Sequence, residues 1–171
     1  LAAYHPELVN KLIVLSINHP KAGDKKRAVP VAERKPSYAD HFVSDEFREQ
    51  LTENWFSGWV TDQEAKARYK EAFRKSDKDA MINYYRANYP TLENLNSPDY
   101  LSRKRDMPNI KMPVLIIHGK KDPYALTKAH NNTWDHVDSE LSIVVLPEAG
   151  HFIQQDESEK VTQLISTFLI E

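Results

Sequence analysis

Three short, almost wholly apolar runs lie near the two ends of the chain. They cover residues 11–18, 114–119 and 141–146. Runs of this length and composition are typical of strands that are buried on both faces of a parallel sheet. We therefore predict three parallel strands and an α/β fold.

Helices are expected after the second and third strands. The first covers residues 124–136, and the second carries an apolar stripe at helical spacing, with Asp156 as its predicted N-cap. The stripe consists of Val161, Leu164, Ile165, Phe168 and Leu169. Alternation of strands and helices favours right-handed crossovers, so the last helix should pack on the sheet.

Between the first and second strands, apolar positions follow a helical period. One helix is expected through Phe47, Leu51 and Trp55, which recur every four positions. The next should begin at Thr61, which has capping-box spacing to Glu64. A third is expected after Ser76, through Met81, Ile82 and Tyr85, and a fourth from Ser97-Pro98. We interpret this insertion as a helical lid.

Composition limits the classes of partner. The chain has 171 residues, 40% of them hydrophobic, which is enough for a sizeable core. A net charge of −2 gives no electrostatic reason to expect nucleic acid or an anionic membrane. The chain has no cysteine, so disulfides and thiolate chemistry are excluded. No apolar run approaches the roughly 20 residues that cross a bilayer, and we expect a cytoplasmic protein.

An acid and a histidine follow the last two predicted strands. Asp122 comes after Gly119-Lys120-Lys121, and His151 comes after Glu148-Ala149-Gly150. Because ligands bind beyond the carboxyl ends of strands in open α/β sheets, we expect the two side chains to meet there. A carboxylate that accepts the imidazole N–H fixes its tautomer and stabilises the imidazolium. Each residue alone is more often a turn or surface residue, but the pair favours catalysis.

These segments resemble a known family. Residues 116–122 and 147–152 are similar to the acid and histidine motifs of α/β-hydrolase-fold enzymes, above all epoxide hydrolases, with haloalkane and haloacid dehalogenases next. The resemblance implies the C-terminal part of that fold. Residues 1–19 would hold the end of the helix after the nucleophile and the sixth core strand, residues 20–108 the lid, and residues 109–171 the last two core strands with their helices.

Two lid segments resemble those that carry the tyrosines of epoxide hydrolases. Residues 81–88 match one and residues 36–42 the other, which implies that Tyr85 and Tyr38 polarise the epoxide oxygen. Two phenol O–H groups suit this task, because ring opening develops alkoxide charge. Core packing is the alternative reading of Tyr85, and Tyr84 is a competing candidate.

The other histidines have less specific expected roles. His118 is expected inside a strand, and His19 at the rim of the site. Structural or exposed positions are expected for His5, His41, His130 and His136. No histidine pair has the helical spacing of a metal site, so we predict neither a metal nor another cofactor. Asn18 stands where some dehalogenase relatives carry their acid, and it cannot supply a carboxylate.

The family's nucleophile elbow, an Asp or Ser between glycines, has no match among the four glycines. The oxyanion-hole motif has no match either. The resemblance places both before Leu1, so we expect a fragment of a longer protein that is inactive alone. The edge of the strand at residues 11–18 would then be unpaired, which predicts self-association or a complementary chain.

The parent protein is expected to open a small apolar epoxide through an Asp ester, which a water activated by His151 would hydrolyse. Three alternatives stay open. A dehalogenase could use Trp55, Trp59 or His41 as halide donors. A serine esterase would differ in its nucleophile. A non-catalytic ligand-binding protein could share the same fold.

Overall fold

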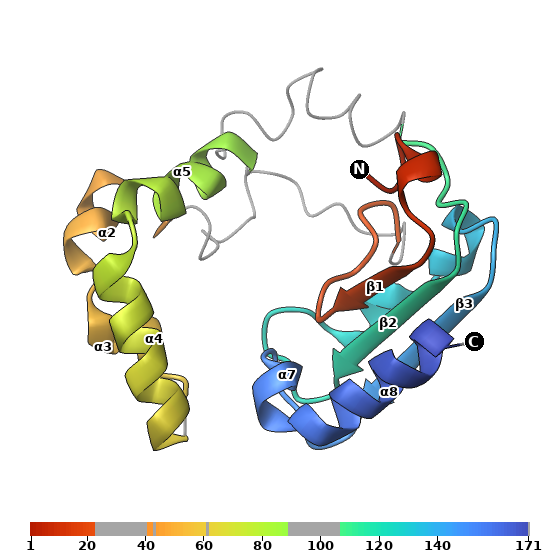
Figure 1. Ribbon diagram of the computed structural model, residues 1–171. Helices are drawn as coiled ribbons and strands as arrows, with labels where there is room; N and C mark the ends of the chain where they lie inside the picture. The colour runs from red at the N-terminus through yellow and green to blue at the C-terminus, as the bar shows by residue number, and fades with distance from the viewer. Residues whose placement is uncertain (23–40, 43, 61, 89–106, 171) are drawn as a thin grey trace. The chain divides into compact units, whose positions relative to one another are not determined.

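A computed structural model describes residues 1–22, 41–42, 44–60, 62–88 and 107–170 of the chain (Figure 1). The chain divides into two compact units. The sheet unit combines Leu1–Ala28 with Ser102–Glu171, and the helical unit covers Val29–Leu101. Tyr38 and the helix predicted after Ser97 lie outside the described residues.

The sheet unit contains three parallel strands in the order β1-β2-β3, as predicted (Figure 1). They are β1 (Leu12–Leu15), β2 (Val114–Gly119) and β3 (Leu141–Leu146). The first strand is shorter than the predicted 11–18, because Ser16 has a φ of 53° and leaves the extended conformation. The N–H of Ser16 still donates to the carbonyl of Ile117, at 2.9 Å.

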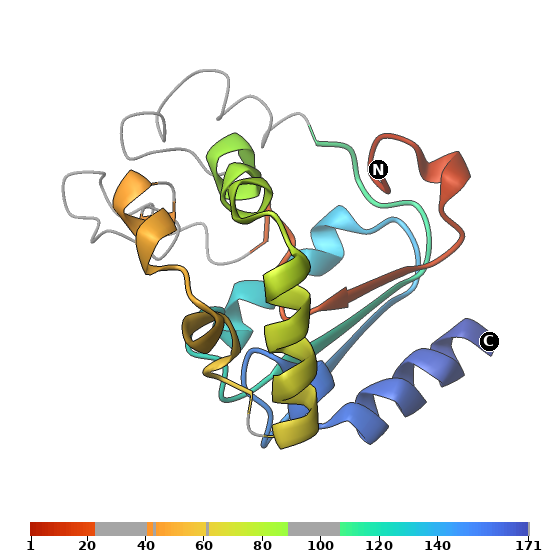
Figure 2. The same cartoon turned by 60° about the vertical axis from the view of Figure 1, so that its left-hand side comes forward.

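The central strand β2 is buried along its whole length, because a strand flanks it on each side and side chains cover both of its faces. On one face, Leu115 and Ile117 pack against α8 (Ser158–Ile170), as predicted for the last helix. Figure 2 shows this helix, in blue, on one side of the strands. On the other face, Val114 and Ile116 pack with residues of the N-terminal segment and the loop before β2.

The C-terminal helix is interrupted, and the prediction of Asp156 as its N-cap is wrong. A short helix, α7 (Ile153–Asp156), ends at this residue, and α8 begins at Ser158. The carboxylate of Asp156 instead accepts the N–H of Gly150, at 2.8 Å. This bond ties α7 to the loop that follows β3.

The single helix predicted for residues 124–136 is also wrong. Two short 3₁₀ helices occupy this segment, η3 (Thr127–His130) and η4 (Thr133–His136). Between them Asn132 adopts the left-handed conformation, with a φ of 64°. Asparagine tolerates this conformation better than most residues. A residue in the left-handed conformation cannot continue a right-handed helix, so the segment is divided at Asn132.

The N-terminal residues form a turn, and the end of a helix at this position stays a prediction. The N–H groups of Tyr4 and His5 both donate to the carbonyl of Leu1, at 3.0 and 2.8 Å. The 3₁₀ helix η1 (Pro6–Leu8) follows and begins at the proline. This turn brings Ala3 into the core that includes Val114 and Ile116, on the face of the sheet opposite α8.

The helical unit contains α2 (Asp45–Gln50), α3 (Glu53–Ser57), α4 (Gln63–Lys75) and α5 (Lys78–Asn88). Its core is built from Phe47, Leu51, Phe73 and Ile82. The helical nature of this segment was predicted correctly.

The predicted helix boundaries in this unit need correction. The stripe of Phe47, Leu51 and Trp55 spans two helices, because the Thr52 side chain accepts the N–H of Trp55 at 3.3 Å and starts α3. The N-cap of α4 is Asp62, one residue after the predicted Thr61, and it accepts the N–H of Ala65 at 2.7 Å. Short polar side chains next to each other compete for such a cap, and spacing alone does not choose between them.

Within the part of the chain that the structure describes, no helix is both long and apolar enough to cross a membrane.

Candidate active site

The loops after β2 and β3 approach each other closely at the carboxyl end of the sheet. The N–H of Lys120 donates to the carbonyl of Leu146, and the N–H of Lys121 donates to that of Ala149, both at 2.9 Å. Gly119 permits this approach, because a Cβ there would lie 2.0 Å from the carbonyl oxygen of Gly150. The packed loops carry Asp122 and His151.

The structure brings Asp122 and His151 together. The Nδ1 of His151 lies 2.7 Å from Oδ2 of Asp122. The Asp122 side chain is fully buried, whereas 32% of the His151 side chain is exposed. Since a carboxylate only accepts hydrogen bonds, Nδ1 carries a proton, and in the neutral imidazole the lone pair is then at Nε2. The imidazole is therefore oriented on its buried side and partly accessible to solvent.

Backbone groups hold the other oxygen of Asp122. Its Oδ1 accepts the N–H of Tyr124 at 2.8 Å and the N–H of Ala125 at 3.0 Å. Burial acts to raise the pKa of this carboxyl, but the hydrogen bonds from His151, Ala125 and Tyr124 outweigh it, and the net effect is a lowered pKa. Asp122 is thus an ionised acceptor at neutral pH.

Two aromatic rings flank the imidazole of His151. Tyr124 lies 5.1 Å from it, centroid to centroid, and Phe152 lies 5.2 Å from it, both in edge-to-face geometry. Tyr124 was not predicted as a site residue. Its position two residues after the acid, in the turn that the carboxylate caps, was the signal that could have found it.

A third side chain lies behind the acid. His118 is fully buried in β2, and its Nε2 lies 2.7 Å from the carbonyl oxygen of Ala125 and 3.9 Å from Oδ2 of Asp122. Its ring meets His130 edge-to-face at 4.6 Å. The sequence placed His118 inside a strand, but it gave no indication of this proximity to Asp122.

His19 belongs to a separate pair in the sheet unit. Its ring stacks on His136, with centroids 5.0 Å apart and planes at 16°. Its Nδ1 accepts the N–H of Lys21 at 3.2 Å. Burial, followed by the charges of His136 and Lys21, lowers the pKa of His19 to about 4. The placement of His19 at the rim of the site stays a prediction.

The tyrosine predictions concern the helical unit. Tyr85 lies on α5, is half-buried, and packs edge-to-face on Phe42 at 4.8 Å and on Tyr84 at 5.5 Å. The competing candidate, Tyr84, is 61% exposed. Tyr38 lies outside the described residues.

The three candidate halide donors also lie in this unit. Trp55 is about half exposed, at 47%. His41 packs edge-to-face against Phe47, with centroids 4.8 Å apart. The indole N–H of Trp59 donates to the backbone carbonyl of Phe56, at 2.9 Å. Because an indole has a single N–H donor, this bond occupies the group that a halide would need.

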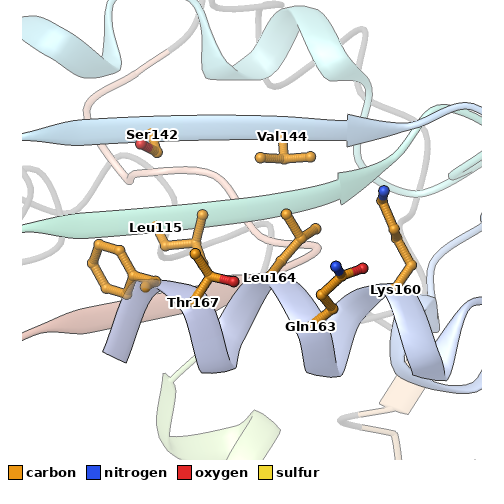
Figure 3. A pocket seen from close by; sticks show the side chains of 8 residues that line it. Leu115, Ser142, Val144, Lys160, Gln163, Leu164 and Thr167 are labelled. Atoms are coloured by element: carbon orange, nitrogen blue, oxygen red, sulfur yellow. The ribbon is translucent and has the colours of Figure 1, made fainter. Parts of the chain in front are cut away.

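A cavity of about 260 Å³ lies between the sheet and α8, away from Asp122 and His151 (Figure 3). Its apolar lining comes from Leu115, Val144, Leu164 and Phe168, and its polar lining from Ser142, Lys160, Gln163 and Thr167. Neither Asp122 nor His151 lines it. Among the described residues no group of three or more metal-binding side chains could hold a metal ion.

A scan against protein-family models and a search of curated proteins find no match. Solved structures do match. An epoxide hydrolase from Bacillus megaterium in complex with an inhibitor is 22% identical, with a TM-score of 0.74, and the match covers 99% of this chain and 64% of that one. A mutant of potato epoxide hydrolase is 20% identical, with a TM-score of 0.66 and the same coverage.

An esterase from Exiguobacterium antarcticum also matches, at 18% identity and a TM-score of 0.63, over 95% of this chain and 58% of that one. The chain therefore spans less than two thirds of the length of these structures. At such identities the likeness shows the fold. The predicted fold is confirmed: three parallel strands with flanking helices, as in the C-terminal part of an α/β-hydrolase fold.

Proposed function

We propose that this chain carries the acid and the base of a hydrolase, with Asp122 orienting His151. The observation that carries the proposal is the 2.7 Å contact between a fully buried carboxylate and a partly exposed imidazole. A structural histidine has no need of a buried, ionised partner that costs free energy to desolvate. A general base does, because the carboxylate stabilises the imidazolium that forms when the base accepts a proton.

The reaction that fits best is epoxide hydrolysis by way of an enzyme ester. A carboxylate nucleophile attacks an epoxide carbon, the C–O bond of the ring breaks, and a phenol of the lid protonates the alkoxide. Tyr85 and Tyr38 are the proposed donors. Support comes from the lid motifs in the sequence and from the epoxide hydrolases among the structures that share the fold.

His151 acts in the second step. Its Nε2 takes a proton from a water molecule while the water oxygen attacks the carbonyl carbon of the ester. Asp122 stabilises the imidazolium during this transfer. The bond to the diol then breaks, and the imidazolium returns its proton to the departing alkoxide. The second proton of the water passes from the regenerated carboxyl to the phenolate that the first step left in the lid, so the nucleophile and the phenol both return to their starting states. Small apolar epoxides are the proposed substrates.

The nucleophile in this proposal belongs to a segment outside these 171 residues. Three described glycines, Gly58, Gly119 and Gly150, do not flank an Asp or Ser at a turn from a strand into a helix. Without a nucleophile there is no ester for His151 to hydrolyse. On this proposal the 171-residue chain alone is inactive.

The test is to trap the ester in the full-length gene product. We expect His151→Gln to react with styrene oxide and to gain the mass of one epoxide, because the first step proceeds and the second does not. The unaltered enzyme should release the diol and keep its mass. Intact-protein mass spectrometry measures both.

Other outcomes would contradict the proposal in distinguishable ways. A mass gain only with a haloalkane, accompanied by halide release, would indicate a dehalogenase. Adduct formation only with an activated ester would indicate a serine esterase. If His151→Gln turned over styrene oxide as fast as the unaltered enzyme, His151 would not be the base.

A further inference from the structure

His118 stands out among the residues of β2. The other residues of this strand are aliphatic or glycine, and an aliphatic side chain at this position would fill the core without burying polar atoms. The imidazole is nevertheless completely buried. Its Nδ1 has no hydrogen-bond partner within the described residues. A buried polar atom without a partner costs free energy, so the role of the imidazole must lie in its other nitrogen.

That other nitrogen makes one short hydrogen bond. Nε2 of His118 lies 2.7 Å from the carbonyl oxygen of Ala125. A carbonyl oxygen only accepts, so Nε2 carries the proton and donates it. The carbonyl of Ala125 thereby selects a single tautomer of His118, with the bare nitrogen at Nδ1.

Ala125 connects His118 to the acid of the candidate site. The same residue that accepts from His118 through its carbonyl donates through its N–H to Oδ1 of Asp122, at 3.0 Å. The direct distance from His118 to Oδ2 of Asp122 is 3.9 Å, which is too long for a hydrogen bond. The imidazole therefore acts on the carboxylate through the backbone.

Hydrophobic packing does little to hold this loop. Two of its residues, Tyr124 and Leu126, are 62% and 54% exposed. Segments with little buried apolar area open easily, and their hydrogen bonds determine their conformation. Because Ala125 is bonded on one side to β2 and on the other to Asp122, His118 anchors the loop to the most buried strand of the sheet.

We propose that His118 is a positioning residue for the Asp122–His151 pair, holding Ala125 so that its N–H keeps the carboxylate in place to orient the imidazole. Its importance for turnover rests on the proposed function. The positioning itself is a property of the chain, and it is measurable without any reaction.

The experiment compares His118→Phe with His118→Gln in the 171-residue chain by nuclear magnetic resonance. Phenylalanine fills the space but donates nothing, whereas the amide nitrogen of glutamine can stand in for Nε2. Nitrogen-15 spectra report the tautomer of His151, and carbon-13 spectra report the titration of the Asp122 carboxyl.

With His118→Phe, His151 should change from the single Nδ1–H tautomer to a mixture of both tautomers, and Asp122 should titrate at higher pH. With His118→Gln, both signals should stay as in the unaltered chain. His130→Phe is the matched control, because His130 is also buried, beside His118, and no hydrogen bond of its ring nitrogens is found in the described residues. It should leave both signals unchanged.

Three results would overturn the proposal. His118→Phe could leave the His151 tautomer and the Asp122 titration unchanged. His130→Phe could disturb both as strongly, which would indicate core packing alone. If His118→Phe fails to fold, the unaltered chain still decides, because a mobile mixture of His118 tautomers would contradict the anchoring bond. Failure of the ester-trapping experiment would leave these signals unaffected, so the two proposals fail separately.

Discussion

At the scale of single residues, the sheet unit controls the charge of its buried groups by hydrogen bonding. Asp122 stays ionised because three donors face it, which outweighs the cost of burial. His19 shows the opposite case. It is partly buried beside His136 and near the charge of Lys21, and its pKa falls to about 4. The fold therefore prefers His19 neutral.

This preference predicts a loss of stability in mild acid. The unfolded chain binds a proton at His19 below its ordinary pKa of about 6.5, whereas the folded chain does so only near 4. Stability should therefore be highest above about pH 6.5 and fall as the pH drops toward 4, by roughly 1–3 kcal/mol from this residue. Urea unfolding at pH 7 and pH 5 measures the loss.

The matched variant is His19→Asn, whose side-chain oxygen can still accept the N–H of Lys21 but does not titrate. It should lose less stability between pH 7 and pH 5 than the unaltered chain. Equal losses in the two proteins would assign the acid sensitivity to other groups, such as His130, whose pKa is also lowered by burial and by His118.

At the scale of elements, the close approach of the loops after β2 and β3 places Asp122 against His151. It depends on Gly119, where a Cβ would lie 2.0 Å from the carbonyl oxygen of Gly150 and 2.5 Å from that of Ala149. Both obstacles are backbone atoms, which cannot rotate away. A side chain here can fit only if the two loops separate.

Gly119→Ala should therefore destabilise the chain by roughly 1–3 kcal/mol, as expected for overpacking against rigid atoms. It should also weaken the contact between Asp122 and His151. Gly150→Ala is the control, because the nearest atom to a Cβ there is the carboxylate of Asp156, at 3.3 Å. In thermal unfolding, Gly119→Ala should have the lower melting temperature of the two variants. Equal melting temperatures would contradict this explanation.

At the scale of the whole molecule, the sheet has an open edge within the described residues. Strand β1 pairs only with β2 there, and all four of its residues are half-buried. The N–H groups of Leu12 and Ser16 donate toward β2. Strand alternation therefore places the N–H groups of Ile13 and Leu15 on the outer edge. Such an edge favours pairing with another chain.

We expect the 171-residue chain to self-associate with rising concentration through β1. Ile13→Pro removes an outward donor without touching the bonds to β2, and it should shift the chain toward monomer. Ile13→Ala, which loses a similar amount of packing but keeps the N–H, should not. Light scattering over a concentration series measures the mass, and a monomer at all concentrations would contradict the prediction.

Comparison with the sequence shows which features are local. Strands β2 and β3 were predicted at their observed bounds, because a buried strand requires a continuous apolar run. The placement of Asp122 and His151 followed from the strands, since the ends of parallel strands lie on one edge of the sheet. Helix boundaries were less predictable, as Thr52 and Asp62 illustrate, because neighbouring polar side chains are nearly equivalent as caps.

The sequence by itself determined the three parallel strands and the position of Asp122 and His151 just beyond two of them, because burial and periodicity are properties of neighbouring residues. Only the tertiary structure decided the rest: that Asp156 bonds Gly150 instead of capping a helix, that Asn132 divides a predicted helix, and that His118 lies behind the acid. Asp156 and His118 bond to loops outside their own helix and strand, and neither these bonds nor the left-handed conformation of Asn132 follows from apolar periodicity. A single hydrogen bond is enough to select among conformations that local preferences leave close in free energy.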